Sequence, residues 1–384
     1  MKRFLICAVS GLFTLFAAVP AFADSSLSSA EVSAKAAILI EAGSGRVLYE
    51  KNADQPMPMA STTKIMTAIL AIEKSGLDDT VVVGKNASGV EGSSIWLSVG
   101  EKMSLSDMLF GLMLASGNDA AIAIAEHVSG SVDAFAELMT ARARELGAKN
   151  TNFMNPNGLP DDNHYTTAHD LALITAHAMQ LPFFCEVVKT QYKKIPWEGH
   201  EWDRVVKNKN KILWNYEGGN GVKTGFTKKA GRCLSAAAER DGMQLVSVVL
   251  NAPDMFGDCM AMMDYGFSNY QNQCILEADT HAGRVKVLQG VDDGFDVYTP
   301  QDIRYPLTAQ EAARVETRIT LEPQLRAPVR KGQQVGSVQL LLNGRLIYEQ
   351  PLFCPVSIGE NSYTFNLGRL IDLWIGRKIL DMAS

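Results

Sequence analysis

The chain has 384 residues, of which 47% are hydrophobic and 20% are charged, and its formal net charge at pH 7 is -6. This length and composition suit a globular protein with one large core and a second, smaller domain, and they exclude a disordered chain. The acidic balance argues against nucleic acid as the main partner.

Residues 1–23 predict a secretory signal peptide. Lys2 and Arg3 precede the apolar run FLICAVSGLFTLFAAV, and Ala21-Phe22-Ala23 is a small-x-small cleavage site. An uncut membrane anchor is the alternative interpretation. Cleavage before Asp24 would remove the two cations and move the formal charge from -6 to -8.

The cysteines predict neither a disulfide framework nor a metal site. Five of them follow the signal peptide, an odd number at scattered spacings without a CxxC pair. We expect most of them to be small buried hydrophobic residues.

Residues 24–275 predict one domain in which strands, then helices, then strands follow one another. AAILIEAGSGRVLYE has two apolar runs around Gly43-Ser44-Gly45, which indicates a β-hairpin. From Ser61 to about Gly147, segments rich in Ala, Leu, Met and Ile predict buried helices. Strands return in NGVKTGFT, RCLSAAAE and MQLVSVVLNA, with Asp241-Gly242 as a two-residue turn. This order predicts an α+β fold, an antiparallel sheet flanked by helices.

Two further segments follow this domain. Residues 276–360 predict a small all-β domain. VETRITL alternates apolar and polar residues, as a strand does, and SVQLLLNGRLIYEQ has the pattern of a hairpin around Asn343-Gly344. Residues 361–384 predict an amphipathic helix with one apolar side: Leu367, Leu370, Ile371, Trp374, Ile375, Ile379 and Met382. Its charged residues disfavour a membrane span and favour a helix at the membrane surface, whereas docking on the protein's own core or on a partner is the alternative.

Three short polar motifs carry the chemistry. Ser61 and Lys64 are three residues apart at the start of an apolar helix and therefore share one face. Burial and a second cation at Lys223 would lower the Lys64 pKa, so that its amine activates the hydroxyl. Ser116-Gly117-Asn118 lies in a loop between helices, and Lys223-Thr224-Gly225 lies on a strand. Each motif alone fits a helix cap or a strand end, but the three together are far more specific.

With these motifs the chain resembles the penicillin-recognising serine hydrolases, and within them the low-molecular-mass penicillin-binding proteins that are serine-type D-alanyl-D-alanine carboxypeptidases. The resemblance covers most of the chain, from ASTTKIMTA through GSSIWLSVGEKMSLSDMLFGLMLASGNDAA and NFMNPNGL to GVKTGFTKKAGRCL. It implies a β-lactamase/transpeptidase-like fold.

The resemblance also implies the roles of the motif residues. Ser61 is the expected nucleophile, Lys64 its base, and Ser116 a proton relay between Lys64, the leaving amine and Lys223. These roles make Ser61, Lys64 and Ser116 the predicted catalytic residues.

The predicted substrate-binding residues come from the second and third motifs. Asn118 is expected to orient Lys64 and the substrate amide, while Lys223 and Thr224 suit a terminal carboxylate. Gly225 leaves room for the acyl chain, and the backbone N–H of Phe226, with that of the nucleophile, would form the oxyanion hole.

The resemblance implies an exported enzyme at the outer face of the cytoplasmic membrane. Its expected reaction removes the terminal D-alanine from peptidoglycan stem peptides that end in D-Ala-D-Ala, through an acyl-enzyme. Penicillin and other β-lactam antibiotics would acylate the same serine, and the terminal helix would contact the membrane surface. No cofactor, metal or nucleic acid is expected.

Two alternatives remain open from the sequence. A β-lactamase shares nucleophile and base but needs a deacylating carboxylate, and the only nearby ExxN, Glu217 to Asn220, reads as a turn. A catalytically silent wall-binding protein is the second alternative. A zinc site at His164, His169 and His177 is not expected, because their spacings of five and eight do not match HExxH. We expect His164 instead to fix the loop before it.

Overall fold

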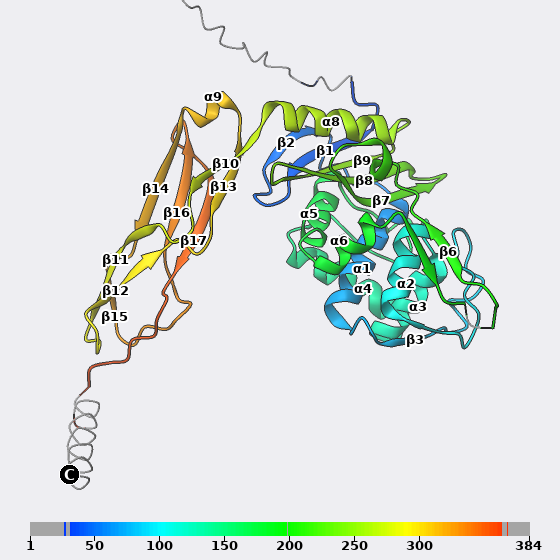
Figure 1. Ribbon diagram of the computed structural model, residues 1–384, viewed down its shortest axis with the longest axis horizontal. Coiled ribbons are helices and arrows are strands. Elements are labelled where there is room, and N and C mark those ends of the chain that lie inside the picture. Colours follow the sequence, from blue (N-terminus) through cyan, green and yellow to red (C-terminus); the bar gives the residue numbers. More distant parts are fainter. Residues whose placement is uncertain (1–26, 28–30, 198, 363–366, 368–384) are drawn as a thin grey trace, which may run out of the picture.

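The computed structural model describes residues 27, 31–197, 199–362 and 367, and it shows two domains, which are joined where helix α8 (Met255–Asn269) leads into strand β10 (Gln271–Leu276) (Figure 1). The larger domain combines a sheet with helices, and the smaller one is built of strands. The predicted signal peptide lies outside the described residues. So does the predicted terminal helix, except for positions 361, 362 and 367.

A five-stranded antiparallel sheet forms the centre of the larger domain, in the order β2-β1-β9-β8-β7. Its strands are β1 (Ala36–Glu41), β2 (Val47–Lys51), β7 (Gly219–Thr227), β8 (Gly231–Arg240) and β9 (Met243–Leu250). The predicted turn at Asp241-Gly242 is confirmed, with φ angles of 50° and 71°. Positive φ at both central residues matches the twist of the two strands that they join.

Both faces of this sheet are covered, so its central strands are apolar throughout. Alternate residues of β1 belong to two core clusters, Ala36, Ile38 and Ile40 to one and Ala37 and Leu39 to the other. Helix α8 (Met255–Asn269) covers one face, and α5 (Ala168–Ala178) lies on the other, together with the helical layer described next (Figure 1). The predicted α+β fold is confirmed.

The helical layer comes from the middle of the chain, as predicted. Its elements are the 3₁₀ helix η1 (Ala60–Thr63), α1 (Lys64–Lys74), α2 (Leu105–Phe110), η2 (Gly111–Ala115), α3 (Asn118–Ser129), α4 (Val132–Glu145), α5 and α6 (Pro182–Lys189). Segment η2 is a π-helix that continues α2, and short π-helical segments are frequent at functional sites. Within the described residues no single helix is long and apolar enough to cross a membrane; α5 and α6 meet that test only jointly, across a bend of 106°.

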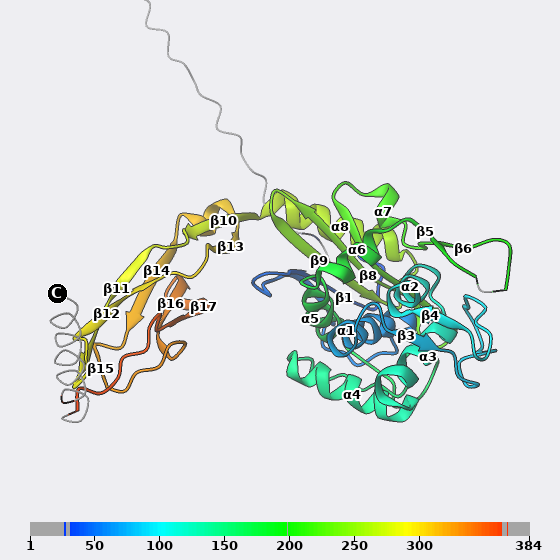
Figure 2. The same ribbon diagram turned by 60° about the horizontal axis from the view of Figure 1, so that its bottom comes forward.

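Two small hairpins and a short helix complete this domain. Strand β3 (Thr80–Val82) pairs with β4 (Lys102–Ser104), and β5 (Tyr192–Ile195) pairs with β6 (Arg204–Lys207). Helix α7 (Ile212–Asn215) leads from β6 into β7. The β5–β6 hairpin projects from the body of the domain, as Figure 2 shows.

The smaller domain is built of strands around a core of its own, which confirms the predicted all-β fold. Its elements are β10 (Gln271–Leu276), β11 (His281–Leu288), β12 (Gly294–Tyr298), β13 (Ile303–Leu307), α9 (Ala309–Ala312), β14 (Val315–Leu321), β15 (Gln324–Arg326), β16 (Gln334–Leu342) and β17 (Arg345–Phe353). The predicted turn at Asn343-Gly344 joins β16 to β17.

Arg46, in the β1–β2 turn, joins the two domains. Its guanidinium donates to the backbone oxygen of Pro306 and pairs with the Glu311 carboxylate. The same group lies over the rings of Tyr270 and Tyr305, 5.1 and 5.3 Å from their centroids. Cation–π contacts and an ion pair thus converge on one side chain.

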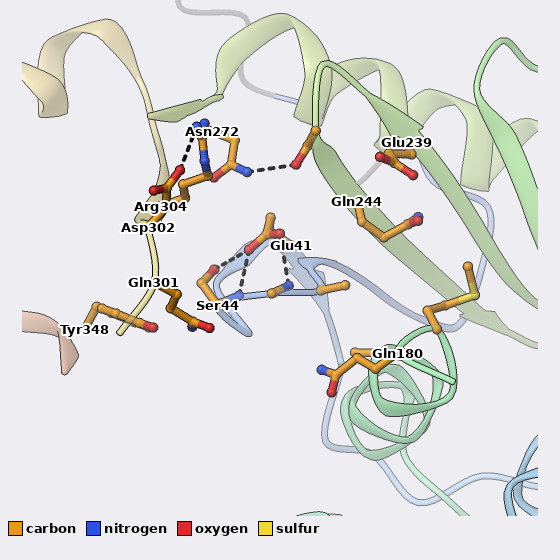
Figure 3. A pocket seen from close by; sticks show the side chains of 15 residues that line it. Glu41, Ser44, Gln180, Glu239, Gln244, Asn272, Gln301, Asp302, Arg304 and Tyr348 are labelled. Atoms are coloured by element: carbon orange, nitrogen blue, oxygen red, sulfur yellow. Dashed lines mark hydrogen bonds and ion pairs between the residues drawn. The ribbon is translucent and has the colours of Figure 1, made fainter. Parts of the chain in front are cut away.

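A cleft of about 420 Å³ lies between the domains (Figure 3). Polar side chains of both domains line it, among them Glu41 and Gln180 from the larger domain and Tyr348 from the smaller one. The Glu41 carboxylate accepts the N–H groups of Gly43 and Ser44 at 2.9 and 2.7 Å. These bonds fix the β1–β2 turn at the edge of the cleft.

The five cysteines of the described residues are free. Cys233, Cys259 and Cys354 are buried, as expected of small hydrophobic residues, whereas Cys274 is exposed and Cys185 is partly exposed.

Candidate active site

The first motif lies where a 3₁₀ helix becomes an α-helix. Ser61 is in η1, and Lys64 is the first residue of α1. Lys64 Nζ donates to Ser61 Oγ at 3.1 Å. The spacing of three residues thus places the hydroxyl and the amine side by side, as the sequence predicts.

The Lys64 side chain is fully buried and surrounded by oxygen acceptors. Besides Ser61, its amine donates to Asn118 Oδ1 at 2.7 Å and to the backbone oxygen of Asn157 at 2.6 Å. Desolvation lowers the Lys64 pKa well below its ordinary value, and the charges of Lys223 and Lys209 lower it further. The predicted direction of this pKa shift is therefore confirmed.

The second motif connects η2 to α3. Ser116 is buried and left-handed, with φ 66° and ψ 34°, and Asn118 begins α3. The Asn118 side chain accepts from Lys64 and donates through Nδ2 to the backbone oxygen of Glu91. Asn118 therefore ties the buried amine to the loop that contains Glu91.

The third motif lies on β7, at the edge of the central sheet and against η1. Lys223 is buried, and its amine donates to the backbone oxygen of Thr224 at 3.0 Å. Desolvation, followed by the charge of Lys209, lowers the Lys223 pKa to about 7. Thr224 is partly buried, whereas the Phe226 side chain is 66% exposed.

Gly225 allows β7 to approach the nucleophile closely. A Cβ at this position would lie 2.9 Å from the backbone nitrogen of Ser61 and 3.1 Å from the backbone oxygen of Met59. Any side chain here would push the strand away from Ser61, so the glycine is required by packing.

The loop before His164 holds Ser61 from the other side, a contact that sequence reasoning missed. The backbone oxygen of Asn157 accepts from Lys64, and Gly158, with φ +87°, packs on the backbone of Ala60 and Ser61. The turn-forming letters NPNG indicate a loop, but nothing in them indicates that a backbone oxygen would face the lysine.

His164 fixes this loop, as expected. Its Nδ1 accepts the N–H of Met154 at 3.0 Å, so we assign the ring proton to Nε2, which lies 2.7 Å from Thr63 Oγ1. Thr63 in turn donates to the backbone oxygen of Ala60 at 2.8 Å. Burial lowers the His164 pKa to about 4, so the imidazole stays neutral at neutral pH.

Lys209 is a third cation beside the buried lysines. It follows β6, is exposed, and its amine donates to Ser93 Oγ at 3.3 Å. Its charge contributes to the lowered pKa values of both Lys64 and Lys223. Sequence reasoning did not select it, because it lies in a lysine-rich segment outside the three motifs.

The residues considered for a zinc site or for a deacylating carboxylate do not lie together. His169 contacts Asp54 and His177 contacts Glu73, so neither lies with His164 at a common point. Within the described residues, no three His, Cys, Asp or Glu side chains form a group that could hold a metal ion. Glu217 lies in the turn between α7 and β7.

A serine hydroxyl beside a desolvated lysine amine, at the edge of an antiparallel sheet, is the arrangement of a serine hydrolase that works by acyl transfer. The family model described as D-alanyl-D-alanine carboxypeptidase matches residues 23–254, and the one described as penicillin-binding protein 5, C-terminal domain, matches residues 270–360. The chain therefore belongs to the D-alanyl-D-alanine carboxypeptidase family.

Individual relatives agree with this assignment. The chain is 33% identical to D-alanyl-D-alanine carboxypeptidase DacF of Bacillus subtilis, over 97% of this chain and 99% of that relative. It is 32% identical to D-alanyl-D-alanine carboxypeptidase DacC of Escherichia coli, over 96% of this chain and 94% of that relative. Among solved structures, penicillin binding protein 5 from Haemophilus influenzae superimposes on this chain with a TM-score of 0.73 at 30% sequence identity. The superposition covers 87% of this chain and 100% of the solved chain.

Proposed function

We propose that this D-alanyl-D-alanine carboxypeptidase uses Ser61 to remove the terminal D-alanine from peptidoglycan stem peptides that end in D-Ala-D-Ala. The observation that carries the proposal is the pairing of Lys64 Nζ with Ser61 Oγ at 3.1 Å, in a buried site that lowers the lysine pKa. Family membership supports the reaction class.

In the first step, neutral Lys64 takes the proton of Ser61, and Oγ attacks the carbonyl carbon of the penultimate D-alanine. The backbone N–H groups of Ser61 and Phe226 stabilise the negative charge that develops on the carbonyl oxygen. The C–N bond then breaks, and the leaving nitrogen takes the proton from Lys64 by way of Ser116. Free D-alanine leaves, and the peptide remains as an ester on Ser61.

In the second step, water attacks the ester carbonyl while Lys64 accepts its proton, and Ser61 regains its hydroxyl hydrogen. Penicillin would acylate the same oxygen. Its ring fragment stays attached to the acyl group and obstructs the approach of water, so the adduct would persist.

The substrate is held between the second and third motifs. Lys223, as an ammonium ion, and Thr224 bind the terminal carboxylate, and Asn118 orients the amide. The close approach of β7 at Gly225 holds this strand beside Ser61. The signal sequence and the apolar side of the terminal segment support an exported enzyme at the outer face of the cytoplasmic membrane.

The Lys223 pKa predicts a falling limb in the pH profile. In the free enzyme Lys223 loses its charge as the pH rises through about 7, so kcat/KM for a carboxylate substrate should fall above that pH. Steady-state kinetics between pH 5 and pH 10 would measure this limb. Lys223→Gln should lose the limb and lower kcat/KM about tenfold to a hundredfold, the value of a charge-assisted contact.

Lys209→Gln is the matched control for this profile. Removing the Lys209 charge removes the second cause of the lowered Lys223 pKa, so the limb should move to higher pH and not disappear. A limb that survives in Lys223→Gln contradicts the assignment of Lys223 to the carboxylate.

The experiment that tests the proposed function is intact-protein mass spectrometry of the wild type and Ser61→Ala after exposure to penicillin, with D-alanine measured after exposure to a D-Ala-D-Ala peptide. We expect a persistent penicilloyl adduct and D-alanine release with the wild type only. Rapid loss of the adduct without D-alanine release would indicate a β-lactamase. No adduct at all would indicate a silent wall-binding protein.

A further inference from the structure

Four of the chain's five tryptophans gather around the β5–β6 hairpin and the loop beside it. Trp96, Trp202 and Trp214 are 74%, 63% and 40% exposed, and Trp197 is partly exposed. We call these four residues, together with Lys207, the hairpin surface. Large aromatic side chains exposed together in this way mark a binding surface more often than single exposed residues do.

The fold holds Trp96 in solvent at a conformational cost. Its φ is +63°, in the left-handed region that bulky residues avoid. The buried Asp119 carboxylate accepts the N–H groups on either side of Trp96, those of Ile95 at 3.0 Å and Leu97 at 3.1 Å. Arg204 donates to the Trp96 backbone oxygen at 3.2 Å. Strain that keeps an apolar ring exposed is expected at a functional position.

The tip of the hairpin is a stack of rings anchored in the protein. Trp202 lies 5.6 Å from His200, and His200 lies 4.1 Å from Trp197, between ring centroids. The Arg204 guanidinium lies 4.5 Å over Trp197, and a buried ion pair at 2.6 Å joins it to Glu101. The aromatic rings are therefore positioned before any ligand arrives, which reduces the entropy lost on binding.

The hairpin surface lies next to residues that border the active site. A cavity of about 400 Å³ is lined by Trp96 and Trp197 and also by Lys209 and Ala115, the residue before Ser116. A second cavity of about 630 Å³ is lined by Lys207, Lys209 and Trp214. Because Lys207 and Lys209 line both cavities, the two cavities adjoin.

The charge of this region is opposite to that of the whole chain. Residues 193–211 carry six cations and three carboxylates, whereas the formal net charge of the chain is -6. Lys207 is exposed, and its amine lies 5.3 Å from the ring centroid of Tyr192 and 5.6 Å from that of Trp214. A ligand that offers both apolar faces and carboxylates is complementary to this pattern.

We propose that the hairpin surface binds the sugar chain of polymeric peptidoglycan, with indole rings against the faces of its pyranose rings and lysines toward the carboxylates of its stem peptides. This inference rests on the proposed function and adds to it a preference for the polymer over a free peptide. The C–H face of a pyranose is a flat apolar surface of about the size of an indole, so stacking removes apolar area of both partners from water.

The test uses the full mature enzyme with Trp202→Ala and Lys207→Gln, two changes outside the catalytic residues. The matched controls are Tyr298→Ala and Lys286→Gln, which remove an exposed aromatic ring and an exposed cation from the smaller domain. For each variant we would measure D-alanine release from glycan strands that carry pentapeptides and from a short acyl-D-Ala-D-Ala peptide, and co-sedimentation with isolated cell-wall sacculi.

Trp202→Ala is expected to lose about tenfold in kcat/KM on the glycan strands, the value of one aromatic contact, and to retain the wild-type rate on the short peptide. Lys207→Gln should lose less, and its loss should shrink at high salt. Equal rates for the wild type, Trp202→Ala and Lys207→Gln on the strands would overturn the inference, as would equal losses on both substrates. If the proposed function itself is wrong, the wild type releases D-alanine from neither substrate.

Discussion

Lys64→Gln is expected to slow the acylation of Ser61 by about a thousandfold, within the range that a general base contributes. Glutamine retains a donor for the oxygen of Asn157 but has no basic nitrogen for the serine proton. The rate of penicilloyl adduct formation, followed by mass spectrometry at pH 7, measures the effect. An acylation rate within tenfold of the wild type would show that another group is the base.

The matched control is Lys74→Gln, at the exposed C-terminal end of the same helix. It changes the formal charge equally and should leave acylation unaltered. Thermal unfolding of both variants separates catalysis from folding. Burial of the amine costs free energy, whereas its hydrogen bonds stabilise the fold, so the replacement should change the free energy of unfolding only slightly; a large loss of stability would assign Lys64 a structural role.

Gly158→Ala is expected to impair both folding and acylation. An added Cβ would lie 1.9 Å from the backbone oxygen of Ala60 and 2.9 Å from the backbone nitrogen of Ser61, and backbone atoms cannot move aside as a flexible side chain can. We expect a loss of about 3 kcal/mol in the free energy of unfolding, from overpacking and left-handed strain. A displacement of Ser61 by about 1 Å should lower the acylation rate about a hundredfold.

Gly130→Ala provides the comparison for Gly158→Ala. Gly130 also has a positive φ, +76°, but an added Cβ there meets nothing within 4 Å. It should cost only about 1 kcal/mol, the strain of a left-handed alanine, and leave acylation unchanged. Denaturant unfolding and penicillin acylation of the two variants measure both effects. Equal losses in the two would show that the contact with Ala60 and Ser61 is unimportant.

Local patterns were sufficient to predict the sheet, its hairpins and the first motif. Asp241-Gly242 and Asn343-Gly344 determine their turns through residues that accept positive φ, and the three-residue spacing of Ser61 and Lys64 determines their contact within one helical turn. The order of strands and helices was enough for the α+β fold, because helices must cover the apolar faces of the sheet.

The remaining parts of the site depend on contacts that sequence spacing does not encode. The backbone oxygen of Asn157 reaches Lys64 only because His164 and Gly158 hold their loop against η1. Lys209 becomes part of the site only when the chain returns past Ser93. Backbone groups have no signature of their own in a sequence, and one lysine among several neighbours cannot be distinguished before the fold is known.

The pairing of β1 with β9 has a consequence for how the protein is made. Ala36 lies opposite Leu250, so β1 cannot pair with β9 until most of the larger domain has been synthesised. Until then the apolar segment AAILIE can pair only with β2, and closing the long loop to β9 slows folding. The nascent chain is thus exposed to aggregation for most of its synthesis, and a fragment that ends before β9 should not fold.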